Sequence, residues 1–140
     1  MLMQIKDVLG DLIYEGKGSI TGSRVLDGGK NLIEYSLLEN GKFRNIEVVI
    51  TSTFWTIPTA KDTVYGEAQA TITAKDSREI ATYRGCGLGY FVEEGKTIFR
   101  GTNFYRVLPS GNLSFLNNIV GALEAEAYKN RHLGKMWEWK

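Results

Sequence analysis

The stretch Thr82–Phe91, TYRGCGLGYF, is the part of the sequence that decides the fold. It places Gly85, Gly87 and Gly89 at alternate positions of a segment that otherwise has the composition of a β-strand. A strand normally avoids glycine, because each glycine loses side-chain packing and costs backbone entropy. A barrel wall must coil sharply, however, and residues without a Cβ atom permit that bend. The pattern therefore favours a closed barrel.

Small residues recur at alternate positions in two further segments. Tyr14–Gly22, YEGKGSITG, begins with a Tyr-x-Gly-x-Gly run, and the segment YGEAQATI places Gly66, Ala68 and Ala70 on one face. Because a period of two makes the faces alternate without labelling them, either face of the Thr82–Phe91 strand could point inward. Any small residues that do point inward leave room inside the barrel.

Alternation with a period of two extends over nearly the whole chain and predicts an all-β protein. Turn signals such as Asn40-Gly41, the strongest hairpin signal, separate the strands. Short loops make consecutive strands antiparallel neighbours, and closure removes exposed edges, which favours an eight-stranded up-and-down barrel over a sandwich. We also note a short helical pattern at residues 2–9. The expected strands are 12–26, 31–39, 42–57, 63–75, 79–92, 96–108, 113–128 and 132–139.

The composition bounds the class of protein. The 140 residues suit one domain, 1–140, and the net charge of +1 leaves no electrostatic footprint for nucleic acid or for a membrane surface. One cysteine excludes an internal disulfide and a cysteine-rich metal site, and one histidine excludes a multi-histidine metal centre. We expect no metal and no cofactor. The N-terminus does not resemble a signal peptide, which favours a cytoplasmic location. The question of a homo-oligomer stays open.

The segment Arg78–Val107 resembles the Gly-x-Gly-x-Phe strand and following hairpin of the allene oxide cyclase and dirigent superfamily, a group of calycin-like eight-stranded barrels. The chain is also similar to small uncharacterised microbial proteins that end in a strand like Trp137–Lys140. The cyclase resemblance implies a dry cavity in which a carboxylate and a held water steer a reactive apolar substrate. The matching carboxylate is Glu15, whereas Lys17 stands where the family has an asparagine.

Carboxylates are the candidates for acid–base chemistry. Glu67 lies in mid-strand, and an inward position would raise its pKa and suit it to a catalytic role. The alternative, which the alternation favours, is that Gly66, Ala68 and Ala70 point inward and that Glu67 is solvated. Cys86 lacks a nearby base and is interpreted as structural.

A second set of candidates consists of polar and aromatic side chains on the faces that we take as inward. An asparagine on an apolar face needs a hydrogen-bond partner, which is either the backbone or a ligand held in a pocket. Aromatic neighbours either line that pocket or fill the core. The candidate ligand-binding residues are Trp55, Tyr83, Asn103, Tyr105 and Asn117.

These patterns lead to three hypotheses. The first is a barrel that binds a small apolar molecule in its interior. The second is a cofactor-independent isomerase or cyclase that uses Glu15 or Glu67. The third is a packed structural or oligomer-forming barrel without a ligand. Interior volume separates the first two hypotheses from the third, and a buried carboxylate within reach of the ligand separates the first from the second.

Overall fold

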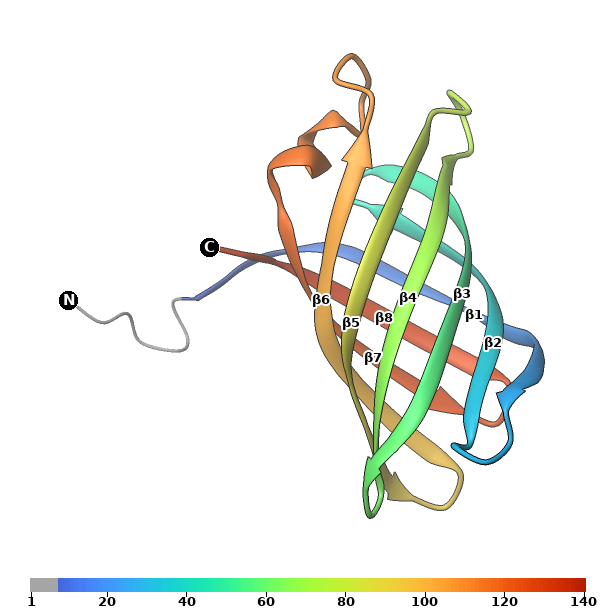
Figure 1. The fold of residues 1–140 in the computed structure, drawn as a ribbon. Coiled ribbons are helices and arrows are strands. Elements are labelled where there is room, and N and C mark those ends of the chain that lie inside the picture. Colours follow the sequence, from blue (N-terminus) through green and yellow to red (C-terminus); the bar gives the residue numbers. More distant parts are fainter. Residues whose placement is uncertain (1–7) are drawn as a thin grey trace.

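The computed structural model describes residues 8–140, which form the closed antiparallel barrel that the sequence predicts (Figure 1). Each strand pairs with the next along the chain, and the last strand pairs with the first. The predicted helical turn at residues 2–9 falls outside the described residues except for its last two positions, and Leu9 begins the first strand. The strands are β1 (Leu9–Asp27), β2 (Leu32–Phe43), β3 (Ile46–Ala60), β4 (Thr63–Ala74), β5 (Ile80–Glu93), β6 (Lys96–Val107), β7 (Val120–Tyr128) and β8 (Arg131–Trp139).

The hairpin between β2 and β3 turns later than the Asn40-Gly41 signal indicates. β2 continues to Phe43, and the chain turns at Arg44, whose φ of 54° supplies the left-handed conformation that the turn requires. Phe43 is fully buried, so the longer strand places its ring in the core. The prediction of a turn at Asn40 was therefore wrong, because the burial of Phe43 outweighs the local turn propensity of Asn-Gly.

The predicted strand 113–128 begins instead with a short 3₁₀ helix, η2 (Ser114–Asn118), and only β7 is extended. Leu113 and Leu116 are both fully buried, and their spacing of three residues is that of a 3₁₀ turn. The carboxylate of Glu79 accepts hydrogen bonds from the backbone N–H groups of Asn112 at 2.9 Å and Leu113 at 2.6 Å. These contacts tie the start of the segment to Glu79, directly before β5, and η2 lies beside β6.

The largest aromatic contacts of the core join β1, β2 and β6. Tyr14 and Phe43 have ring centroids 4.6 Å apart, and Phe43 meets Tyr105 edge-on at 5.8 Å. Ile13 and Met136 are buried in the same cluster, as are Leu113, the residue before η2, and Leu116 within it. The core therefore extends from the barrel interior to the segment that carries η2.

The glycines of β5 point into the barrel, which answers the question that the sequence leaves open. Their neighbours Arg84, Cys86 and Leu88 are exposed, and Gly85, Gly87 and Gly89 alternate with them. Gly87 lies directly opposite Gly66 on β4 and Gly101 on β6. Three neighbouring strands therefore present backbone alone to the interior along this row.

A side chain at Gly87 is expected to destabilise the barrel, because a Cβ atom there meets the backbone of Gly101 at 2.8 Å. We expect Gly87→Val to lower the free energy of unfolding by about 1–3 kcal/mol, as overpacking does. Gly22→Val is the control, since nothing lies within 4 Å of a Cβ atom at that exposed position. Urea unfolding of both variants measures the effect, and equal losses would show that the Gly66–Gly87–Gly101 row is not closely packed.

Within residues 8–140, no helix is long and apolar enough to cross a membrane.

Candidate functional site

The barrel interior contains a cavity of about 90 Å³ with predominantly apolar walls. Small residues form much of its lining, including Gly66, Gly87 and Gly101 of the glycine row and Ala68 beside it. Larger apolar side chains, among them Leu37, Ile50, Phe54, Phe99, Leu123 and Met136, complete the wall. The inward glycines therefore do more than bend the strands, because they also form part of the cavity wall.

Three polar side chains meet on the other side of this cavity, on the neighbouring strands β2, β1 and β8. Gly18 of β1 is paired with Glu39 of β2 on one side and with His132 of β8 on the other. Because Gly18 has no side chain, the carboxylate and the imidazole can approach each other across β1. Nδ1 of His132 lies 2.7 Å from Oε2 of Glu39.

The other oxygen of the Glu39 carboxylate accepts a hydrogen bond from the hydroxyl group of Tyr14. The ring of Tyr14 lies over Gly16 and Gly41, where an added Cβ atom would strike the ring or its hydroxyl group. Tyr14, Glu39 and His132 are exposed by only 2%, 5% and 9% of their surfaces. Because Gly16 and Gly18 of β1 have no side chains, they leave space for the buried side chains of Tyr14, Glu39 and His132.

In the neutral tautomer of His132 that carries its hydrogen on Nδ1, that hydrogen is donated to Oε2 of Glu39. The neutral ring then has its lone pair on Nε2. No hydrogen bond among residues 8–140 uses Nε2, and His132 lines the cavity.

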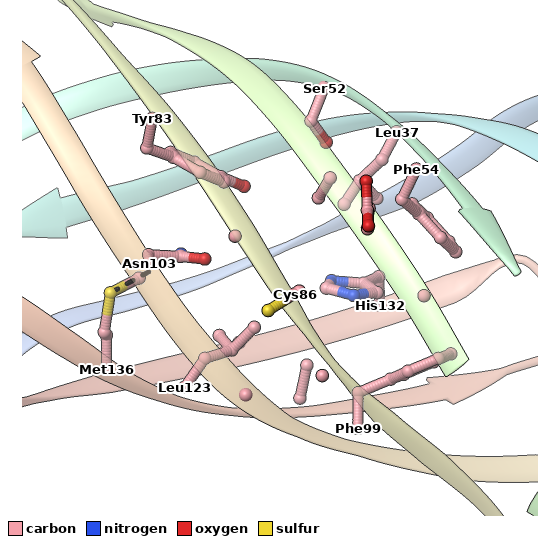
Figure 2. Close-up of a pocket in the computed structure, with 18 of the residues that line it drawn as sticks. Leu37, Ser52, Phe54, Tyr83, Cys86, Phe99, Asn103, Leu123, His132 and Met136 are labelled. Carbon is pink, nitrogen blue, oxygen red and sulfur yellow. Dashed lines mark hydrogen bonds between the residues drawn. The ribbon is translucent and has the colours of Figure 1, made fainter. Parts of the chain in front are cut away.

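Asn103 supplies a second polar group to the cavity from β6. It is 2% exposed, and its Nδ2 atom lies 3.7 Å from the sulfur of Met136, which is a weak acceptor. The amide lies over Gly85, where a Cβ atom would collide with it. Figure 2 shows the side chains of Asn103, Tyr83 and His132 pointing into the same interior space. A bound oxygen atom would be a better partner for this amide than the thioether.

Burial raises the pKa of Tyr14, Tyr83 and Tyr105 well above the ordinary value, and the Glu39 carboxylate adds to the effect at Tyr14 and Tyr83. The folded protein therefore keeps these phenolic protons at pH values where the unfolded chain, with a tyrosine pKa of about 10, has lost them. Their contribution to stability is fully present below about pH 10 and is lost as the pH rises further.

We expect an alkaline titration to show directly that ionisation of these tyrosines is coupled to unfolding. The phenolate absorbance of Tyr14, Tyr83 and Tyr105 should appear together with the loss of native tryptophan fluorescence, in one cooperative step above about pH 10. The variant Tyr83→Phe should reduce the absorbance change in that step. Complete tyrosine ionisation with native fluorescence retained would contradict the burial of Tyr14, Tyr83 and Tyr105.

The structure brings only some of the predicted ligand-binding residues to the cavity. Tyr83 and Asn103 line it, and Tyr105 lies next to them, with its ring edge-on to Tyr83 at 5.9 Å and its hydroxyl group against the sulfur of Met136. Trp55, by contrast, packs against Tyr65 with centroids 5.7 Å apart, on the outward row of β3 and β4, so its place on the cavity wall is corrected.

Asn117 is also placed away from the cavity, in η2, and it is exposed. Its side chain accepts a hydrogen bond from the N–H group of Val107 at 2.9 Å and donates one to the carbonyl oxygen of Val107 at 2.8 Å. Of the two alternatives for this residue, the backbone partner is the one that the structure contains. The assignment of Asn117 to an inward strand face is corrected, because the segment is helical there.

Both predicted catalytic carboxylates lie on the outer surface. Glu15 is exposed and lies 3.5 Å from Nζ of Lys135. Glu67 is exposed and accepts a hydrogen bond of 2.7 Å from the hydroxyl group of Tyr65, which raises the pKa of Tyr65 to about 12. Since β-strand faces alternate, the inward positions of Gly16 and Gly66 turn their neighbours Glu15 and Glu67 outward.

The sequence reasoning missed the cluster of Tyr14, Glu39 and His132. The signal that could have found it was the run Tyr14-x-Gly16-x-Gly18, since three inward positions with one large polar ring and two bare glycines imply side chains arriving from neighbouring strands. Cys86 is exposed. Within the part of the chain that the structure describes, no group of three or more histidine, cysteine or acidic side chains could hold a metal ion.

Solved structures share this barrel. The chain matches a crystal structure of a protein of unknown function from Clostridium acetobutylicum ATCC 824 with a TM-score of 0.79 and 10% sequence identity, over 93% of this chain and 98% of that one. It matches a conserved protein of unknown function from Rhodopseudomonas palustris with a TM-score of 0.75 and 12% identity, over 93% and 97%. These likenesses show the fold alone. No family model matches the chain, and the search of curated proteins found no match.

Proposed function

We propose that the barrel binds a small, predominantly apolar molecule in its interior, with one polar group of that molecule hydrogen-bonded to Asn103 or His132. The observation that carries this proposal is that the amide nitrogen of Asn103, inside an apolar cavity, has a thioether as its hydrogen-bond acceptor among residues 8–140, with the hydroxyl group of Tyr105 beside the amide. A buried amide normally has a strong partner, and leaving it without one costs free energy. A ligand oxygen would supply that partner.

The size of the cavity bounds the ligand. An engineered apolar cavity of about 150 Å³ takes up benzene, so a cavity of about 90 Å³ suits a molecule of roughly four non-hydrogen atoms. Drug-sized ligands require pockets of about 300 Å³ or more. The resemblance to allene oxide cyclases and dirigent proteins supports an interior site through the form of the barrel, with the buried carboxylate on β2 at Glu39 rather than on β1 at Glu15.

Binding can be tested with acetone and 2-propanol as probes, followed by NMR. We expect saturable shifts in the resonances of Leu123 and Met136, which line the cavity. Ala68→Leu fills the cavity from β4 and should abolish these shifts, whereas Ala122→Leu, on the outward row of β7 opposite Thr102 and Trp137, should leave them unchanged.

Native mass spectrometry of the purified protein, with release of bound material on denaturation, would identify a natural ligand. Two results together would overturn the proposal: no co-purified molecule, and no saturable shift of an interior resonance with either probe. The packed structural barrel would then be the better description of the protein.

A further inference from the structure

We propose that His132 and Glu39 form a general-base pair that moves a proton on a small carbonyl compound held in the cavity. This inference rests on the proposed binding function and adds a chemical activity to it. Its basis is that one cavity is lined both by an imidazole on β8 that a buried carboxylate on β2 orients, and by an amide donor on β6 whose acceptor is a thioether.

The base is Nε2 of His132. Because Nδ1 donates its hydrogen to Oε2 of Glu39 at 2.7 Å, the lone pair of the neutral ring is on Nε2. A general base must reach the proton that it removes, and His132 belongs to the cavity lining. Within residues 8–140, no group is hydrogen-bonded to Nε2 of His132.

Glu39 is a positioning residue for that base. The hydroxyl group of Tyr14 holds one carboxylate oxygen, and the imidazole occupies the other, so the carboxylate is fixed at both ends. When Nε2 takes up a proton, the ring becomes positively charged, and the adjacent carboxylate stabilises it. Tyr14 and Glu39 are the titratable groups that contact or surround the imidazole, and Tyr83 is coupled electrostatically to Glu39.

The carbonyl oxygen of the substrate would be held on the other wall. Asn103 presents its amide, and Tyr83 keeps its hydroxyl proton because burial raises its pKa. Hydrogen-bond donors aimed at a developing negative charge in a dry site stabilise it strongly. Asn103 and His132 both line the cavity, and Figure 2 shows both side chains pointing into it, so the substrate of this proposal is a small carbonyl compound that contacts both.

The proton transfer is balanced without any cofactor. Nε2 removes a proton from the carbon next to the carbonyl group, and the electron pair of the broken C–H bond forms the C=C bond of an enolate. The π pair of the C=O bond moves onto the oxygen. The imidazolium then returns the proton to carbon, either to the same atom, which is exchange, or to another atom of a conjugated enolate, which is isomerisation.

The experiment uses acetone in D₂O with the full-length protein, and NMR follows the replacement of its hydrogens by deuterium. We expect exchange faster than in buffer containing free imidazole at the concentration of the protein. His132→Gln should lower the protein-dependent rate by about 10²- to 10⁴-fold, the usual contribution of a general base. Glu67→Gln, which changes a carboxylate on the outer face, should leave the rate unchanged.

Chemical rescue separates catalysis from a structural role. Added imidazole should restore exchange in His132→Gly, because it can occupy the vacated space, and it should not restore exchange in Glu39→Gln. If acetone shifts the Leu123 and Met136 resonances but exchange equals that in buffer, the base proposal is overturned and binding stands. If acetone causes no shift and exchange equals that in buffer, both the binding proposal and the base proposal are overturned. A full exchange rate in His132→Gln would also exclude His132 as the base.

Discussion

Replacement of Phe43 by alanine is expected to lower the free energy of unfolding by about 3–5 kcal/mol. The ring is fully buried, with Tyr14 at 4.6 Å on one side and Tyr105 at 5.8 Å on another. Truncation removes its apolar surface from the core and leaves a cavity that rigid strands on both sides fill only in part. Urea unfolding followed by tryptophan fluorescence measures the loss.

Phe104→Ala is the matched control, since Phe104 is also in a strand but is 57% exposed. We expect its effect to stay within about 0.5 kcal/mol. A similar loss in both variants would mean that Phe43 is not the packing centre described above.

The second large effect is expected at Glu39. Glu39→Leu removes the acceptor of both Tyr14 and His132, which are buried and have no alternative partner for these hydrogens among the described residues. Breaking a buried pair on one side typically costs about 3–5 kcal/mol, because the remaining polar groups stay desolvated. Glu67→Leu, on the outer face, should cost less than about 1 kcal/mol.

The triple variant Tyr14→Phe, Glu39→Leu and His132→Leu tests why the cluster exists. Replacing a buried polar group together with all its partners is often neutral or stabilising, so the triple variant should be more stable than Glu39→Leu alone. Recovery of stability without recovery of proton exchange would show that the cluster serves chemistry rather than the fold. A triple variant less stable than Glu39→Leu would instead make the cluster a structural element.

The barrel itself could be predicted because its signals are local. Strand faces alternate along the sequence, and the loops between strands are short, so the order of strands follows from adjacent segments alone. The row of Gly85, Gly87 and Gly89 correctly favoured closure. The direction in which that row points depends on contacts with neighbouring strands, for example between Gly87 and Gly101, and no local pattern reports it.

The polar cluster could not be predicted in the same way. Glu39 and His132 are 93 residues apart in the sequence. They meet because the closed barrel places β1 between their strands, with Gly18, which has no side chain, between the two residues. The Asn40-Gly41 signal also placed Glu39 at the end of a strand, where a carboxylate is expected to be solvated. The prediction for Asn117 was wrong because of a misleading local pattern. A period of two fits Phe115, Asn117 and Ile119, but the backbone at Asn117 is a 3₁₀ helix.

The pairing of β1 with β8 has a consequence for how the protein is made. During synthesis the first strand leaves the ribosome long before its final partner, and until then β1 lacks the neighbour that holds one of its edges. Contacts between such distant segments form slowly, since the chain must close a very long loop. Tyr14 and Glu39 can meet early, but His132 joins them only when the last strand docks. An incomplete chain therefore has no base at this site, and any proton-transfer activity would begin only after the last strand is in place.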